Sequence, residues 1–169
     1  MEIRHNILYK IEASDLDNGL LQIPAHVTSI ADKALMECQD LKSVIFPDNL
    51  THIGHSAFYS CNSLKEITIP SGVTKLSFDI FGECRNLTKV SLPASLITIY
   101  DSAFLGCENL SEIQIPHTVK YIGNRAFYGC DNLNEIILPS ELEFLGNNSF
   151  SSSTKVIMPS LLKRPFNEN

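Results

Sequence analysis

The chain has 169 residues, 44% of them hydrophobic, and a formal net charge of −6 at pH 7. An acidic chain without a basic run is a poor ligand for nucleic acid or an anionic membrane surface, and no apolar stretch is long enough to insert into a bilayer. The first six residues lack the basic head and apolar core of a secretory signal. We therefore expect a protein that stays inside its cell or leaves it without such a signal, unless the sequence starts after a signal that was removed.

The first expected element is an N-terminal cap at residues 1–20. An array of repeats exposes the core of its first unit, so the segment before it has to shield that core. Within this segment, Asn18-Gly19 is typical of a two-residue turn between antiparallel strands. We expect it to turn the first hairpin of the molecule.

Residues 21–159 repeat with a period of 23. A strict period of this length indicates one supersecondary unit stacked on copies of itself, which predicts a repeat solenoid in a single domain. No linker or low-complexity segment interrupts the array. The residues that mark the period are the prolines Pro24, Pro47, Pro70, Pro93, Pro116 and Pro139 and the cysteines Cys38, Cys61, Cys84, Cys107 and Cys130.

Each repeat is predicted to contribute a short strand just before its proline. Apolar and polar residues alternate there, as in Leu110, Ile113 and Ile115, which is the pattern of a strand with one buried face. The strands are expected to stack into a parallel sheet along one face of the coil, with little helix. After each proline the returning segment buries two further apolar columns, which include Val119 and Ile122.

A large residue recurs on the far side of every coil, directly after a small one. We expect these residues to stack as a spine that stabilises the solenoid. The cysteines occupy a column beside it, where a free thiol acts as a small apolar side chain, and no Cys-x-x-Cys pair indicates metal or redox chemistry. No cofactor or metal is expected. The spine residues are Leu35, Phe58, Phe81, Phe104, Phe127 and Phe150.

The last coil, from Phe150 to Pro159, is three residues shorter than its neighbours and lacks both the cysteine and the leucine that should follow it. It is interpreted as a degenerate terminal repeat. Residues 160–169, with Leu161, Leu162 and Phe166, are expected to form a C-terminal cap. The predicted organisation is thus one complete domain over residues 1–169.

The unit I-P-x-x-[VL]-x-x-I-G-x-x-A-F-x-G-C-x-x-L-x-x-I-x-[IL]-P, clearest from Ile115 to Pro139, resembles the BspA-like class of leucine-rich repeat. The resemblance covers about Leu20 to Pro159, and residues 6–11 also resemble the strand that caps the first repeat in such proteins. It implies a right-handed leucine-rich-repeat solenoid for protein interaction, frequently found on the surface of bacteria or of host-dwelling protists, and no enzyme. The family does not share one ligand.

The outward positions of the predicted strands form two columns that the core does not constrain. A rigid sheet that presents variable side chains at a fixed pitch is the usual binding surface of a solenoid. Glu112 and Glu135 are neighbours in one column, at a spacing that a paired-carboxylate glycosidase could use. Because Lys89 offsets their charge and the face is open, catalysis is the weaker interpretation. The columns are Leu20, Ser43, Glu66, Lys89, Glu112, Glu135 and Lys155, and Gln22, Ile45, Thr68, Ser91, Gln114, Ile137 and Ile157.

Apolar residues gather near the C-terminal half of this face. Ile137 and Ile157 stand in an outward column, and Tyr121 and Phe144 replace the polar residues of earlier coils at one repeat position. We predict that these four side chains form a patch for a protein partner on the same face. The alternative is that the C-terminal tail covers them. The predicted rim of the patch is Glu112, Glu135, Gln114 and Lys89.

The sequence therefore predicts a non-catalytic protein-interaction module, monomeric, with association through its ends as an option. Three alternatives stay open: an exported effector or surface adhesin of a host-associated microbe, a self-associating structural spacer, and a carbohydrate-active enzyme that uses Glu112 and Glu135.

Overall fold

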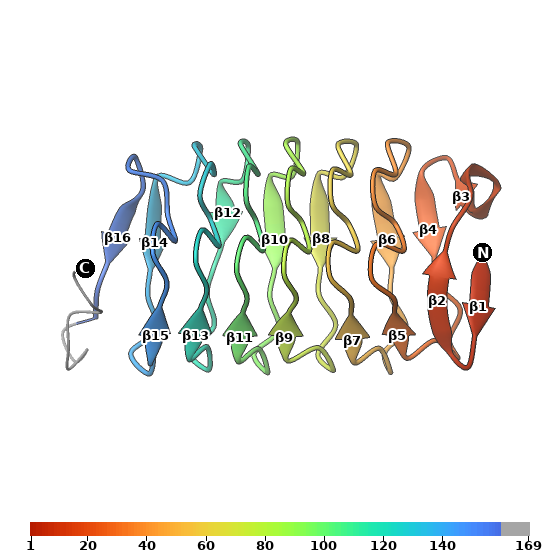
Figure 1. Ribbon diagram of the computed structural model, residues 1–169, viewed down its shortest axis with the longest axis horizontal. Helices are drawn as coiled ribbons and strands as arrows, with labels where there is room; N and C mark the ends of the chain where they lie inside the picture. Colours follow the sequence, from red (N-terminus) through yellow and green to blue (C-terminus); the bar gives the residue numbers. More distant parts are fainter. Residues whose placement is uncertain (160–169) are drawn as a thin grey trace.

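The structure, a computed structural model, describes residues 1–159. The chain winds into successive coils that stack along one axis (Figure 1), and among the described residues the only helical segment is the short 3-10 helix η1 (Ala13–Asp15). This confirms the predicted solenoid with little helix. The expected C-terminal cap at residues 160–169 lies outside the described residues.

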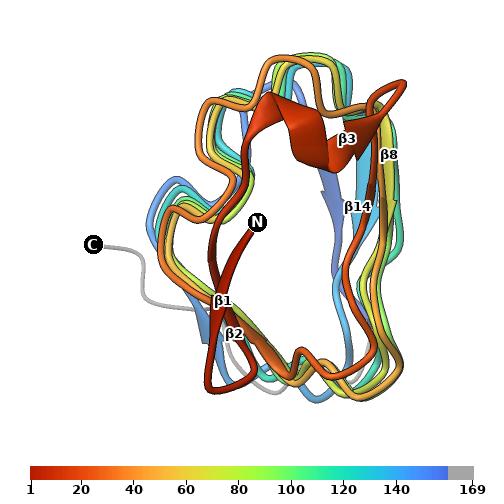
Figure 2. The same ribbon diagram turned by 90° about the vertical axis from the view of Figure 1, so that its right-hand side faces the viewer.

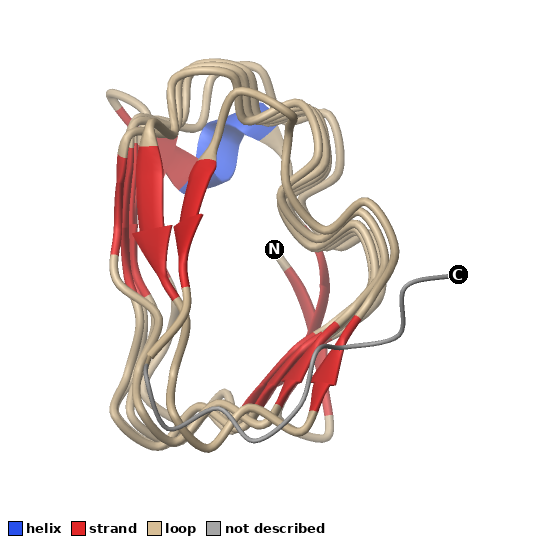
Figure 3. Ribbon diagram, turned by 90° about the vertical axis from the view of Figure 1, so that its left-hand side faces the viewer, coloured by secondary structure: helices blue, strands red, loops and turns tan. Residues whose placement is uncertain are grey.

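Each coil carries strands on two opposite sides of its cross-section (Figures 2 and 3). The strands before the prolines pair in parallel and in the predicted register, with Lys89 opposite Glu112 and Glu135 opposite Lys155. We call them the long-strand stack. Its members are β4 (Leu20–Gln22), β6 (Ser43–Ile45), β8 (Glu66–Thr68), β10 (Lys89–Ser91), β12 (Glu112–Ile113), β14 (Glu135–Ile137) and β16 (Lys155–Ile157).

The returning segments, which the sequence pattern marks only as apolar columns, form a second set of strands, the short-strand stack. Its members also pair in parallel, with Thr98 opposite Tyr121 and Tyr121 opposite Phe144. They are β2 (Ile7–Lys10), β5 (Ser29–Ile30), β7 (His52–Ile53), β9 (Lys75–Leu76), β11 (Thr98–Ile99), β13 (Tyr121–Ile122) and β15 (Phe144–Leu145).

The N-terminal segment lies against the first coil. Strand β1 (Glu2–Arg4) pairs antiparallel with β2, which in turn pairs with β5. Strand β3 (Leu16–Asp17) pairs antiparallel with β4 through the turn at Asn18 and Gly19, whose φ angles are 51° and 92°. Positive φ at both central residues is the geometry of a tight hairpin turn, so the predicted hairpin is confirmed.

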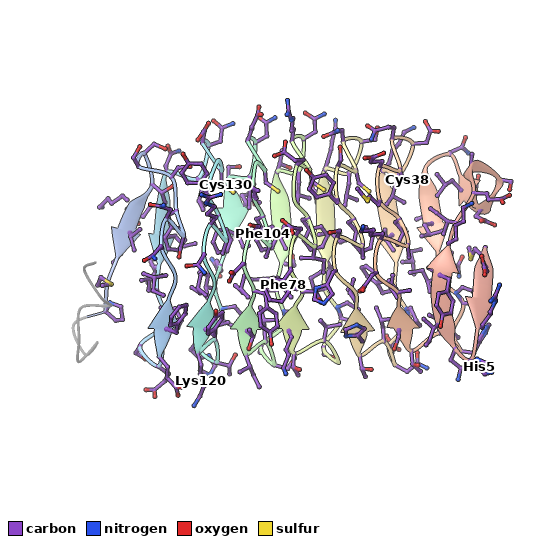
Figure 4. The ribbon with its side chains drawn as sticks, in the orientation of Figure 1. His5, Cys38, Phe78, Phe104, Lys120 and Cys130 are labelled. Carbon is purple, nitrogen blue, oxygen red and sulfur yellow. The ribbon has the colours of Figure 1, made fainter. Side chains whose placement is uncertain are left out.

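The phenylalanine spine runs through the interior of the coils, as the sequence predicts; Phe104 is labelled in Figure 4. Phe58, Phe81, Phe104 and Phe127 are fully buried, and neighbouring rings from Phe58 to Phe150 stack with centroids 5.0–5.5 Å apart. Leu35 fills the same position in the first coil, and Phe46 contacts Phe58 edge-on. The core is therefore one continuous apolar column with a ring in nearly every coil.

The cysteines are free thiols beside this spine, also as expected. Four of them are buried, and each donates its S–H to a carbonyl of the preceding coil at 2.9–3.2 Å. Burial raises the pKa of all four, to about 12 for Cys84 and Cys130. Cys38, in the first complete coil, is partly exposed. The thiols serve packing and hydrogen bonding.

At one corner of the coil, an Asx–Gly pair couples some turns to the next. The carboxylate of Asp101 accepts the backbone N–H of Asn124 at 3.0 Å, and the Asn124 side chain accepts that of Asn147 at 2.8 Å. The residue just before each such N–H is Gly123 or Gly146, and a side chain there would overlap the backbone of the preceding coil. Asp32 with Gly54 makes the same pair earlier in the chain.

Gly123→Ala is expected to lower the free energy of unfolding by about 1–3 kcal/mol, because the new methyl group must displace the Asp101 backbone as well as its carboxylate. Urea unfolding followed by circular dichroism measures the change. Ala31, at the same repeat position in an earlier coil, supplies the control: Ala31→Gly should cost much less. Equal stability of Gly123→Ala and the wild type would contradict the predicted overlap.

Candidate binding surfaces

The long-strand stack presents the two predicted columns to solvent. In both columns every side chain is exposed except Leu20 and Ile157, which are half-buried. Ile137 is the most exposed large apolar side chain described, at 62%, and Ile45 on β6 is 49% exposed. The core does not use this face, so its side chains are available to a ligand.

Glu112 and Glu135 are each held by a lysine rather than by one another. Lys89 pairs with Glu112 at 2.9 Å, and Lys155 pairs with Glu135 at 2.8 Å, so the two carboxylates are drawn to opposite sides. All four side chains are largely exposed to water. An acid and base pair of a glycosidase needs one carboxyl group with a raised pKa in a protected cleft, and this arrangement offers no such environment.

The long-strand stack is not one continuous sheet. Among residues 1–159, β3, β4 and β6 form one sheet, β8, β10 and β12 form a second, and β14 pairs only with β16, so the stack is interrupted between β6 and β8 and between β12 and β14. A hollow of about 630 Å³ lies at the break between β12 and β14. Its lining includes Ile113, Gln114, Ile115, Glu135 and Ile137. A second hollow of about 520 Å³ adjoins it between β10 and β12, lined in part by Lys89, Glu112 and Gln114.

The eight predicted site residues do not form one patch. Lys89, Glu112, Gln114, Glu135, Ile137 and Ile157 lie on the long-strand stack, and the first five line the two hollows. Tyr121 and Phe144 lie on the short-strand stack, on the opposite side of the coil (Figure 2). The reason is the turn at each proline: Pro116 accepts the N–H of Val119 at 3.1 Å, which reverses the chain between the two stacks.

Tyr121 and Phe144 instead end a diagonal row of aromatic side chains on the surface of the short-strand stack. We call this row the aromatic string; it consists of His55, Phe78, Tyr100, Tyr121 and Phe144. Phe78, labelled in Figure 4, and Phe144 are 39% and 40% exposed. Successive ring centroids lie 5.2, 4.8, 6.0 and 4.5 Å apart.

The sequence also holds a signal for the aromatic string. At the repeat position of the Asp or Asn in the Asx–Gly pair, two coils have His55 and Phe78 instead. At the repeat position of the glycine, the coils that follow them have Ser77 and Tyr100. Both members of the pair are thus replaced together at these two places.

No group of three or more metal-ligating side chains occurs within residues 1–159. In the same residues, no helix has the length and apolar character needed to cross a membrane.

Repeated coils with leucines at fixed positions and parallel strands on two sides define a leucine-rich-repeat solenoid. The family model of the BspA type leucine rich repeat region matches six copies over residues 28–157. The chain therefore belongs to the BspA-type leucine-rich repeat family, as its sequence pattern predicts. No curated protein matches the chain.

Solved bacterial structures share the fold. A leucine rich cell surface protein of Faecalibacterium prausnitzii is 35% identical, with a TM-score of 0.67, over 71% of this chain and 32% of that one. The leucine-rich repeat protein of T. pallidum is 25% identical, with a TM-score of 0.63, over 87% and 81% of the two chains. A leucine-rich repeat protein of Eubacterium ventriosum, 22% identical, resembles the fold at a TM-score of 0.71 over 95% and 49%. The chain spans about a third of the F. prausnitzii protein and about half of the E. ventriosum protein.

Proposed function

We propose that the chain is a non-catalytic protein-interaction module that binds a partner protein on the exposed face of its long-strand stack. The observation that carries the proposal is the hollow between β12 and β14, where the sheet is interrupted next to Ile137. An exposed apolar side chain beside a groove, with charged residues around it, is the arrangement of an interaction hot spot and its rim. Membership of a leucine-rich repeat family also favours this role.

The chemistry of the hollow favours a partner segment with apolar side chains. Ile113, Ile115 and Ile137 supply apolar surface, and Gln114 adds an amide that both donates and accepts hydrogen bonds. Glu135 and Lys155, already paired with each other, stand at the rim. We expect the apolar contacts to provide most of the affinity and the rim charges to set the orientation of the partner.

The likeness to a leucine rich cell surface protein of F. prausnitzii supports a surface or exported protein as the setting of this interaction. The carbohydrate-active alternative has less support, since Glu112 and Glu135 are exposed and each is paired with its own lysine.

Ile137→Ser is expected to weaken partner binding at least about tenfold, because an apolar side chain of this size that a partner buries at the centre of an interface contributes about 2 kcal/mol or more. A photo-crosslinking residue at position 114 would first capture and identify the partner. Isothermal titration with the purified partner then compares the wild type with the variant. Serine at this position copies Ser91, two coils earlier, so the fold should tolerate it.

Ile45→Ser provides the matched control, because Ile45 is also exposed and occupies the same column on β6, far from the hollow. It should bind the partner as the wild type does. Loss of binding by Ile45→Ser with full binding by Ile137→Ser would move the site along the stack. Binding as tight as that of the wild type by both variants would contradict a site on this face.

A further inference from the structure

The aromatic string lies on the short-strand stack, on the other side of the coil from the proposed protein-binding face (Figure 2). We propose that it binds an extended, arginine-rich segment of a partner protein, with the aliphatic stems on the rings and the guanidinium groups on Asp79 and Asp101. This would be a second binding site, separate from the long-strand stack.

The two carboxylates belong to residues that directly follow rings of the string in the chain: Asp79 follows Phe78, and Asp101 follows Tyr100. The backbone N–H of Asp79 donates to the carbonyl of Asp101 at 3.2 Å. The Asp101 carboxylate is close enough to Tyr121 to raise the pKa of its hydroxyl, although burial is the larger cause. The string and the carboxylates thus form one surface.

The negative charge at this surface is poorly compensated. Within residues 1–159, no ion pair reaches either carboxylate, and the side chain of Asp79 makes no hydrogen bond. The Asp101 carboxylate accepts two hydrogen bonds at 3.0 Å, from the backbone N–H and the side-chain amide of Asn124, and both donors are neutral. Burial raises the pKa of Asp79, and the Asp101 carboxylate raises it further, whereas the His55 imidazole lowers it and so offsets part of the repulsion. A bound cation would relieve this repulsion, and the chain's net charge of −6 would attract one.

The ring geometry suits arginine better than lysine. Tyr121 and Phe144 stack closely, at 4.5 Å and 8°, so they mainly expose their edges to a partner. Tyr100 and Tyr121 are instead 6.0 Å apart and tilted by 54°, so neither ring covers the face of the other. A planar guanidinium can stack on such a partly open face beside Asp101 and bind a carboxylate with two N–H groups, which an ammonium group cannot do.

The shape of the string favours an extended ligand. Its rings come from consecutive coils, since His55, Phe78, Tyr100, Tyr121 and Phe144 follow one another at intervals of about one repeat. A segment laid along the solenoid axis meets one ring after another. Long basic side chains can lay their methylene groups over this apolar row while their heads reach the carboxylates.

The probe for the test is a fluorescent peptide of alternating arginine and glycine, and its comparator has neutral citrulline in place of arginine. Fluorescence anisotropy should show that the wild-type chain binds the arginine peptide at least about tenfold more tightly than the citrulline peptide. Equal affinity for the two peptides, or none for either, would overturn the proposal.

Asp79→Asn combined with Asp101→Asn should weaken binding of the arginine peptide about tenfold or more. Both substitutions copy residues at the same repeat positions, Asn148 and Asn124, and Asn148 has the same φ of 52° as Asp79. The charge-matched control is Asp48→Asn with Glu66→Gln, two exposed carboxylates that make no ion pair within residues 1–159. An equal loss in the control would show that only net charge matters.

Tyr100→Ser combined with Tyr121→Thr removes the tilted pair and copies Ser77 and Thr98 of the neighbouring coils. We expect about a tenfold loss of affinity for the arginine peptide, with an unchanged circular dichroism spectrum and a cooperative unfolding transition as evidence of an intact fold. Unchanged affinity in this variant would rule out the rings as the contact. Ile137→Ser should leave peptide binding unchanged, so this site and the proposed long-strand site can fail independently.

Discussion

Phe104→Ala is expected to lower the free energy of unfolding by about 3–5 kcal/mol. The side chain is fully buried and stacks on Phe81 at 5.5 Å and on Phe127 at 5.0 Å, so its removal leaves a cavity in the middle of the spine. Neighbouring coils pack only against each other, and no third element is available to fill that space. Urea unfolding monitored by circular dichroism measures the loss.

Two further variants test whether the loss of stability in Phe104→Ala comes from the cavity in the spine. Phe104→Leu should cost less than half as much, because Leu35 already fills this position in the first coil. Tyr128→Ala removes a ring that is 49% exposed and should change stability by no more than about 0.5 kcal/mol. Similar losses for Phe104→Ala and Tyr128→Ala would show that the spine does not dominate the stability.

Raising the pH above about 9 should destabilise the protein steeply. An unfolded cysteine loses its proton near its ordinary pKa, whereas burial holds the pKa of Cys84 and Cys130 at about 12 in the folded chain. Between these values the unfolded state binds fewer protons than the folded state, so the free energy of unfolding falls as the pH rises. Each such thiol contributes a slope of about 1.4 kcal/mol per pH unit.

Urea unfolding at about pH 8 and about pH 10.5 tests this dependence. In the variant with Cys84→Ala and Cys130→Ala, the slope should be shallower by the contribution of two thiols. Tyr59 and Tyr121, whose pKa burial also raises, are present in both proteins, so the difference between the slopes isolates the cysteines. The same slope in both proteins would contradict the assigned role of thiol burial.

The repeat predicts what the core requires and is silent about what lies outside it. Positions such as Phe104 and Leu110 must stay apolar in every coil, so their columns, the register of the strands and the buried thiols are all readable from the period. Outward residues such as Gln114 and Ile137 escape that requirement. Nothing in the period marks the break between β12 and β14, since both coils keep its length.

The aromatic string was missed for a geometric reason. A period of 23 compares residues such as Phe78 and Asp101, whereas the ring that stacks on Phe78 belongs to Tyr100, one position earlier in its coil. The next ring, that of Tyr121, likewise lies two positions earlier in its coil than Tyr100 does. Aligning the repeats therefore puts side chains that touch into different columns. The same alignment led to the prediction that Tyr121 and Ile137 share a face, although the turn at Pro116 places them on opposite sides of the coil.

The Asx–Gly pairs limit how such an array can grow by duplication of its coding sequence. In each coil the residue at the glycine position of the pair corresponds to the residue at the Asx position of the preceding coil. Gly123 lies over Asp101, whereas the bulky Tyr100 stacks on Phe78. A duplicated coil inserted at random would bring a bulky residue over an aspartate, or a glycine over a ring, at its new boundary. New coils are therefore expected to fit best when they are duplicated in blocks that keep both halves of each match.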